Sequence, residues 1–146
     1  MMETQVDATF QPLGAFNILL VNMPADLVNQ FNTYVDENQL YLESLSSRLV
    51  GQIRQNEKSQ QLDIPLEDGF GSIMKNFIDG MGTSYVRHGY DGGAVAETYE
   101  LWSNDSYEGD YQPLHMHGSR TPAGLSGFAY LQVPPQIAKG PPGHSV

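Results

Sequence analysis

The spacing of apolar residues changes near residue 93, and this change constrains the fold more than any other feature of the chain. Before it, apolar side chains recur every three or four residues, as they do from Leu27 to Val35, which is the period of a helix face. After it, residues 94–103 (AVAETYELWS) alternate apolar and polar side chains, as a half-buried strand does. The chain is therefore predicted to be α+β, with its helices first and its strands second.

Two main helices are predicted in the first part. Pro24 ends a β-rich run at residues 16–23 (FNILLVNM), and proline suits the first turn of the helix that follows. A second helical pattern covers residues 66–86. Its apolar face consists of Phe70, Ile73, Met74, Phe77, Ile78 and Met81, and Asp63, Glu67 and Asp68 are expected to form its solvated start. A short helical piece is also expected at residues 39–45, and a strand at residues 49–55.

Size and composition favour one globular domain spanning residues 1–146. The 40% hydrophobic content is enough for a core in a chain of 146 residues. Within this domain, residues 1–93 form a helix-rich part, residues 94–133 carry the strands, and residues 134–146 form a tail rich in proline and glycine.

Charge and cysteine content exclude several classes of function. The formal net charge of −10, from 17 acidic and 7 basic residues, disfavours nucleic acid as a partner. The sequence has no cysteine, so thiolate metal sites and disulfide scaffolds are excluded. The acidic N-terminal segment does not resemble a signal peptide, and no apolar run approaches bilayer length. We therefore expect a cytoplasmic protein with no membrane partner.

His115 and His117 are the leading candidate site residues. They lie two positions apart in the run DYQPLHMHGS, and residues two apart on a strand point to the same face. Both imidazoles could then bind one metal ion, as in iron sites that keep open positions for substrate and dioxygen. The spacing alone leaves two interpretations open: a metal site, or a pair of surface or hydrogen-bonded structural histidines.

The sequence around this pair resembles a known family. The run from Trp102 to Val133, with GDYQPLHMHG and LSGFAYLQVP, and the PQIAK that follows, resemble the Fe(II)- and 2-oxoglutarate-dependent oxygenases of cyanobacterial viruses and marine bacteria. LVGQI at residues 49–53 resembles the same group. The resemblance implies N-terminal helices packed on a double-stranded β-helix, or jelly roll, that holds iron in its mouth. It also implies a dioxygenase reaction that couples decarboxylation of 2-oxoglutarate to hydroxylation of a small molecule or a protein.

The resemblance assigns the histidines unequally. His115 takes the position of the family's first iron ligand, whereas His117 stands where most of the superfamily has the carboxylate of H-x-D. Either His117 replaces that carboxylate as a ligand, or the metal affinity is altered or lost. Asp110 ranks low as a further ligand, because at five residues from His115 it points to the opposite face of an unbent strand.

The end of the sequence departs from the family. Such oxygenases carry a distal histidine on a late strand, followed by an arginine that binds 2-oxoglutarate, and no such segment is present up to Val146. His144 lies in the tail rich in proline and glycine, where a solvent-exposed histidine is expected. About five strand-like runs are present, against the roughly eight strands of a jelly roll. The fold and the iron site are therefore expected to be incomplete in this chain as it stands.

Other residues with chemical potential receive structural interpretations. Aromatic residues on the strands are predicted to be core residues in preference to lining a substrate pocket; they are Tyr99, Trp102, Tyr111 and Tyr130. Arg120 is predicted to be a solvated turn residue, although it could pair with a carboxylate. His88 has no partner at ligand spacing and is predicted to lie at a helix end or on the surface.

Two alternatives to the oxygenase remain. One is a non-catalytic oxygenase-fold module with a structural or protein-binding role, for instance in a virus particle. Its open sheet edge would be covered by a second copy or by a partner chain. In a virus, an enzyme would act in the host cytoplasm, whereas the structural module would belong to the virion. The other alternative is a β-fold that binds zinc or another metal without oxygenase chemistry.

Overall fold

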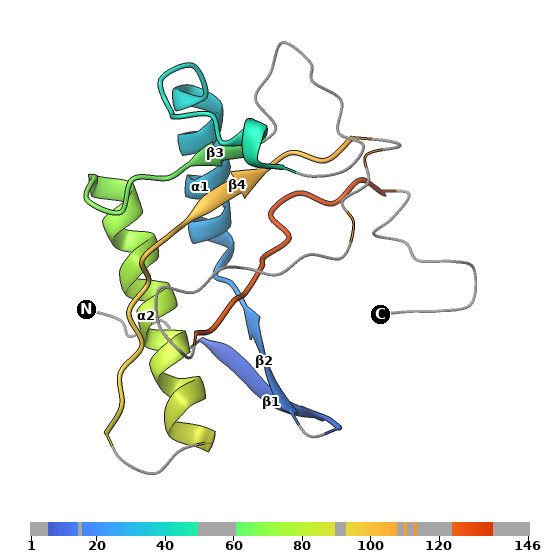
Figure 1. Cartoon of the computed structure of the whole chain (residues 1–146), viewed down its shortest axis with the longest axis vertical. Helices are drawn as coiled ribbons and strands as arrows, with labels where there is room; N and C mark the ends of the chain where they lie inside the picture. The colour runs from blue at the N-terminus through green and yellow to red at the C-terminus, as the bar shows by residue number, and fades with distance from the viewer. Residues whose placement is uncertain are drawn as a thin grey trace. The chain divides into compact units, whose positions relative to one another are not determined.

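The structure is a computed structural model of the chain (Figure 1). It describes residues 6–14, 16–49, 61–89, 93–107, 110, 113 and 124–135. Residues 1–116 and residues 117–146 form two compact units.

The first unit contains all the helices and strands of the described residues. Their order is β1 (Asp7–Leu13), β2 (Phe16–Asn22), α1 (Ala25–Asn38), the 3-10 helix η1 (Ser46–Arg48), β3 (Gln61–Asp63), α2 (Gly69–Gly89) and β4 (Trp102–Asn104). Over these residues the fold is α+β, as predicted, with two α-helices and two small antiparallel sheets. The predicted order of helices before strands is wrong, because β1, β2 and β3 all precede α2. Each sheet has two strands in the described part, and the jelly roll stays a prediction.

Strands β1 and β2 form a hairpin that packs on the C-terminal end of α2. The register runs from Asp7 opposite Asn22 to Leu13 opposite Phe16. The Phe10 ring stacks on His88, with centroids 3.6 Å apart, and the Tyr85 hydroxyl donates a hydrogen bond to the Asn17 carbonyl oxygen at 2.7 Å. The sequence predicted β2 but not β1, because Pro12 and the polar residues around it weaken the strand pattern.

Helix α1 begins directly after Pro24, as predicted. Pro24 occupies the N-cap, and its carbonyl oxygen accepts hydrogen bonds from the amides of Leu27 and Val28 at 2.9 and 3.1 Å. The helix buries Phe31 on its inner face. The helical piece predicted at residues 39–45 is wrong: Leu40 and Tyr41 are 89% and 86% exposed, so no buried face supports another turn there.

Helix α2 begins three residues later than predicted and continues to Gly89. Asp68 sets its start, because the Asp68 side chain accepts a hydrogen bond from the Gly71 amide at 2.6 Å and its carbonyl oxygen accepts one from Ser72. The predicted apolar face is confirmed at the buried Met74, whereas Ile73 is half exposed. The described part of the chain contains no helix that is both long and apolar enough to span a membrane.

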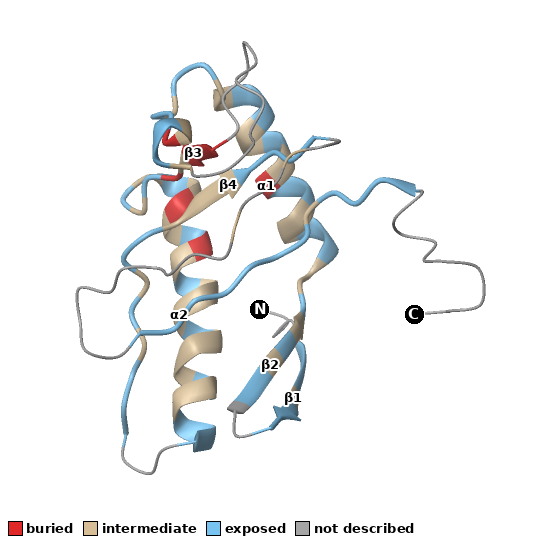
Figure 2. Ribbon diagram, turned by 45° about the vertical axis from the view of Figure 1, so that its right-hand side comes forward, coloured by how far each residue is buried: buried red, intermediate tan, exposed pale blue. Residues whose placement is uncertain are grey.

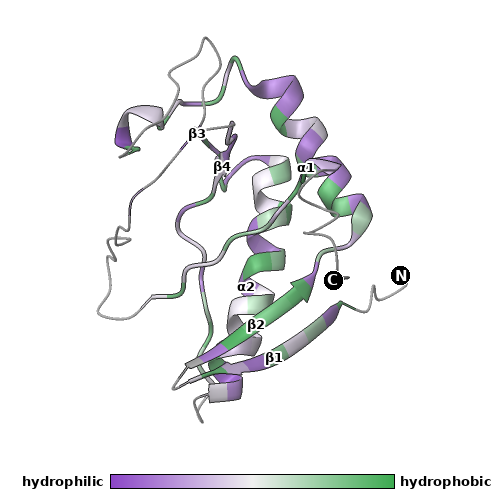
Figure 3. Ribbon diagram, turned by 90° about the vertical axis from the view of Figure 1, so that its right-hand side faces the viewer, coloured by the Kyte–Doolittle hydropathy of each residue, from purple (hydrophilic) through white to green (hydrophobic). Residues whose placement is uncertain are grey.

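A small core lies between the two helices and β3. Its buried apolar side chains are Phe31, Leu45, Leu62, Ile64 and Met74, shown in red in Figure 2 together with the other buried residues. The Phe70 ring joins the helices by an edge-to-face contact with Phe31 and a stacked contact with Tyr34. Figure 3 shows that apolar residues extend beyond this core along β2 and α2.

Strand β4 pairs with β3 beside this core. The register places Leu62 opposite Ser103 and Asp63 opposite Trp102, and the Ile64 amide continues the contact by donating to the Leu101 carbonyl oxygen at 2.9 Å. The long strand predicted at residues 94–103 is therefore wrong over most of its length, because only its last two residues pair with a strand. The earlier residues run along α2 instead.

The described residues of the second unit, 124–135, carry no strand. The strand predicted at residues 125–133 is therefore absent from this segment. Phe128 and Tyr130 are 85% and 78% exposed, with their rings in edge-to-face contact at 5.4 Å. The prediction that Tyr130 is a core residue is wrong for this reason.

Candidate functional site

The two candidate metal ligands, His115 and His117, lie outside the described residues. Tyr111, Arg120 and His144 also lie outside them. The roles assigned to these residues therefore stay predictions. The described residues closest before His115 belong to the turn that follows β4.

Asp110 closes this turn. Its amide donates to the Tyr107 carbonyl oxygen at 3.0 Å, and its side-chain Oδ2 accepts a hydrogen bond from the Tyr107 amide at 2.8 Å. One carboxylate oxygen is thus used for local structure, five positions before the first candidate ligand. Among the described residues, no group of three or more histidine, aspartate or glutamate side chains is arranged to hold a metal ion.

Tyr34 and Asp68 join the two helices beside a shallow, open pocket of about 340 Å³. The pocket is lined by Asn29, Gln30, Thr33, Tyr34, Glu37 and Phe70. The Tyr34 hydroxyl donates a hydrogen bond to Asp68. Burial, this hydrogen bond and the charge of Asp68 together raise the pKa of Tyr34 to about 12. The phenol therefore stays protonated at neutral pH and acts as a hydrogen-bond donor, not as a general base.

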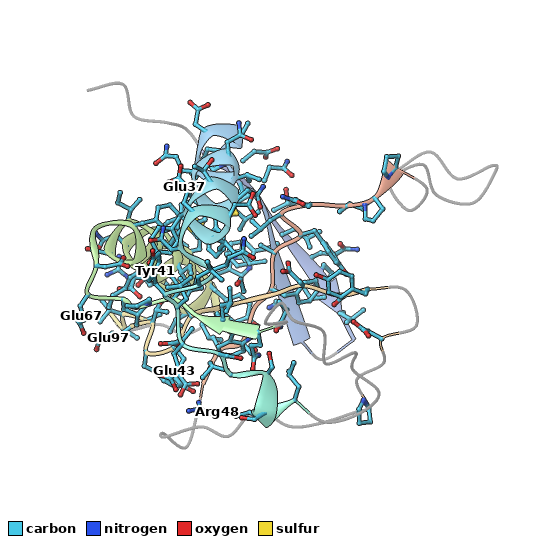
Figure 4. All side chains as sticks on the ribbon, turned by 90° about the horizontal axis from the view of Figure 1, so that it is seen from above. Glu37, Tyr41, Glu43, Arg48, Glu67 and Glu97 are labelled. Carbon is cyan, nitrogen blue, oxygen red and sulfur yellow. The ribbon has the colours of Figure 1, made fainter. Side chains whose placement is uncertain are left out.

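Acidic side chains gather around β3. Burial raises the pKa of Asp63, and the charges of Glu43 and Glu100 raise it further, while Arg48 opposes them. The Asp63 amide also donates to the Glu43 carbonyl oxygen at 2.9 Å, which brings the two segments together. Figure 4 shows Glu43 and Arg48 on the same side of the molecule. A single arginine among several carboxylates matches the acidic balance of the whole chain.

A regular polar arrangement lies between α2 and residues 94–98, which we call the strap. Four polar residues spaced four apart form a stripe along α2: Lys75, Asp79, Thr83 and Arg87. The Thr98 amide donates to Asp79 Oδ1 at 2.6 Å, and the Ala96 amide donates to Thr83 Oγ1 at 3.0 Å. Arg87 Nε donates to the Ala94 carbonyl oxygen at 3.4 Å.

The four-residue repeat of the stripe on α2 matches a two-residue repeat of the strap, because the two repeats have similar lengths. Four helical residues rise about 6 Å, and two extended residues rise about 6.6 Å. Each second residue of the strap therefore meets the next polar side chain of the stripe. The contact satisfies backbone amides with side chains of a helix, in the way that a neighbouring strand would satisfy them with carbonyl groups.

Asp79 is the electrostatic centre of this contact. Burial by itself raises its pKa, but hydrogen bonds from Lys75 and Thr98 outweigh burial and lower the pKa below the usual value. Lys75 Nζ lies 2.6 Å from Asp79 Oδ2 and 3.7 Å from Glu97 Oε1, and the hydrogen bond to Asp79 is the main cause of the raised pKa of Lys75. At neutral pH the stripe therefore presents a charged carboxylate to the strap.

The sequence prediction missed these anchors because it treated the second helix only as a core helix. The signal that reveals them is the four-residue spacing of polar side chains on one face, beside the apolar face that contains Met74. Among the other described candidates, Tyr99 is 43% exposed, so the prediction that it is a core residue is wrong. His88 is exposed in the last turn of α2, as predicted, and Trp102 is partly buried.

Comparison with protein-family models, with curated proteins and with solved structures gave no match. The resemblance to the 2-oxoglutarate-dependent oxygenases therefore depends on the sequence runs around His115 and His117.

Proposed function

We propose that this chain belongs to an Fe(II)- and 2-oxoglutarate-dependent oxygenase, in which His115 and His117 bind the iron. The observation that carries the proposal is the H-x-H pair in DYQPLHMHGS, followed by LSGFAYLQVP. The described elements are α+β in content, and three of their four strands precede α2. The jelly roll itself is part of the proposal.

The donor set suits a divalent first-row metal. Two neutral imidazoles bind Fe(II) well, and the absence of cysteine removes the competing thiolate ligands that favour zinc. When bound, iron would supply the site at which 2-oxoglutarate and dioxygen react. Because only the neutral imidazole binds a metal, the affinity of His115 and His117 for the metal should weaken as the pH falls below about 6.5, the ordinary pKa of histidine.

The test is an anaerobic titration of the full chain with Fe(II) and 2-oxoglutarate. The expected result is the weak visible charge-transfer band of the chelated complex, which His115→Ala and His117→Ala remove. His88→Ala is the matched control, because His88 stacks on Phe10 in the hairpin contact and is not a proposed ligand. The absence of the band from a folded sample would contradict the proposal, and zinc binding without the band would favour a metal-binding β-fold without oxygenase chemistry.

A second variant tests the role of His117 directly. His117→Asp restores the H-x-D pattern of most of the superfamily and adds a negative charge beside the divalent ion. We expect this variant to keep the band and to bind Fe(II) more tightly than the unchanged chain. Fe(II) binding that neither His117→Asp nor His117→Ala alters would show that position 117 does not face the metal.

A protein-binding module is the second candidate, and exposed apolar side chains favour it. In the hairpin, Phe10 and Leu19 share the face toward α2, whereas Leu13, Ile18 and Leu20 are exposed on the opposite face. Leu40, Tyr41, Phe128 and Tyr130 are also exposed. Neighbouring exposed apolar side chains, such as those on the outer face of the hairpin, are typical of proteins that contact a second copy or a partner. Sedimentation over a range of concentrations tests self-association, and a monomer at all concentrations would contradict the form of this candidate in which two copies pair.

A further inference from the structure

The strap has two backbone edges, and only one of them faces α2. The amides of Ala96 and Thr98 donate to side chains of the helix. In an extended chain, the N–H and C=O groups of successive residues point to alternate sides. The N–H groups of Val95 and Glu97 therefore point away from α2, and within the described part of the chain they have no hydrogen-bond partner.

This outer edge is open to solvent. Val95 is 72% exposed, and the side chain of Glu97 is 81% exposed. Figures 1 and 2 both show the strap running along one side of α2 before it reaches β4. Natural sheets protect such edges with proline, with charged side chains, lysine above all, or with a covering segment. Residues 94–98 (AVAET) contain no proline and no lysine, and Glu97 is their one charged residue.

We propose that the outer edge of the strap, from Val95 to Glu97, is a docking site for an extended basic peptide segment that adds to it as a strand. The inner edge is already held by Asp79 and Thr83, so the strap is ordered before the peptide arrives. A preformed strand lowers the entropy cost of strand addition, because only the incoming segment has to be ordered.

The negative charge near the strap favours a basic peptide over a second copy of the chain. The chain carries a net charge of −10, and Glu97 and Glu100 lie on and just after the strap. Two straps from two copies would bring their own glutamates together when paired antiparallel, and like charges on neighbouring strands are unfavourable. Lys75, 3.7 Å from Glu97, and Arg87, whose Nε donates to the Ala94 carbonyl oxygen, offset part of this charge on the helix side of the strap. A segment with lysine or arginine at alternate positions would place its positive charges beside these carboxylates.

The inference goes beyond the iron site and uses none of its residues, so its failure leaves the oxygenase proposal untouched. It gives the protein-binding candidate one defined surface and one class of partner.

The test is a titration of the isotopically labelled full chain with a synthetic peptide of sequence KVTVKVTK, with EVTVEVTE as the control peptide. The expected result is that the basic peptide shifts the amide resonances of Val95 and Glu97 most strongly, while the amides of Ala96 and Thr98 keep their protection from hydrogen exchange. Val95→Pro removes one outward N–H and should weaken binding about fivefold, which is the factor expected for one backbone hydrogen bond. Val95→Thr keeps the N–H and the branched side chain, and it should bind like the unchanged chain.

Glu97→Lys provides a second test that does not alter the backbone. It should weaken binding of the basic peptide about threefold, the factor for an exposed ion pair, and reduce its dependence on salt. Three results would overturn the proposal: no binding of the basic peptide at millimolar concentration, equal binding of the acidic peptide, or loss of protection at Ala96 and Thr98, which would mean that the peptide displaces the strap.

Discussion

Gly71 and Gly80 both lie in α2, but replacing each with alanine should change the stability of the protein in opposite directions. A Cβ atom added at Gly71 would lie 1.8 Å from the Pro65 carbonyl oxygen and 3.0 Å from Asp68 Oδ1. Ordinary van der Waals contacts of such an atom are 3.4–4 Å. At Gly80 no atom outside the adjacent residues and the nearby helix backbone lies within 4 Å of the added Cβ. The loop before α2 thus folds closely over the first turn of the helix, and glycine permits that approach.

The expected magnitudes follow from these surroundings. Alanine is favoured over glycine inside a helix by about 1 kcal/mol, so Gly80→Ala should raise the free energy of unfolding by this amount. At Gly71 the same gain is opposed by overpacking, which costs about 1–3 kcal/mol. Because the obstacle is a backbone carbonyl, the loop must move and the Asp68 cap is disturbed, at a further cost of about 1 kcal/mol. We expect Gly71→Ala to lower the free energy of unfolding by about 2 kcal/mol.

Urea unfolding followed by circular dichroism at 222 nm measures both variants. Gly69→Ala is the matched control near the start of the helix, because no atom lies within 4 Å of a Cβ at that position. The reasoning fails if Gly71→Ala is as stable as Gly80→Ala, since the loop would then not approach Gly71 closely. It also fails if Gly69→Ala loses as much stability as Gly71→Ala, since the effect would then belong to the helix start in general.

Three further predictions concern polar contacts. Asp68→Ala removes the helix cap and the acceptor for Tyr34, and it should lower the free energy of unfolding in urea by about 2 kcal/mol. Asp68→Asn should lose less, because an amide oxygen can still cap the helix. The pKa of Tyr34, raised to about 12 from its ordinary 10, makes the protonated phenol a source of stability that is complete below pH 10 and lost as the pH rises to about 12. Tyr34→Phe should therefore show a smaller fall in stability over this range, and an unchanged slope would contradict the assignment. The lowered pKa of Asp79 gives stability that is present above its ordinary value and lost as the pH falls through the folded value. Asp79→Asn should reduce this acid sensitivity, and Asp79→Ala, which removes the acceptor, should speed hydrogen exchange at the Thr98 amide. Unaltered exchange in Asp79→Ala would show that the strap is held without Asp79.

Periodicity predicted the helices well, because burial acts on one helix face at a time. Pro24 marks the start of α1, and the apolar pattern at residues 66–86 corresponds to α2. The α+β class follows from the same signals. The end of α1 was harder to predict, because Leu40 and Tyr41 look like helix residues by type and are exposed in the fold.

For the candidate metal site, the sequence identified two residues but no geometry. The positions of His115 and His117 lie outside the described residues, so their shared role stays a proposal. The Tyr34–Asp68 contact could not be predicted from spacing, since the two residues are 34 positions apart and meet only because α1 and α2 pack together. A capping role for Asp68 is visible in the sequence as an acidic residue before a helix, but its second partner is not.

The strap shows why an alternating pattern is ambiguous. Ala96 and Thr98 are less exposed than Val95 and Glu97, so the alternation at residues 94–103 did report which side is covered. It did not report what covers that side, because a polar stripe on a helix and a neighbouring strand both leave every second residue protected. The spacing of Asp79 and Thr83 on α2 supplies the missing information. An extended run should therefore be assigned to a sheet only after nearby helices have been searched for polar residues four apart, since such a helix can take the place of a strand on one edge and leave the other edge open.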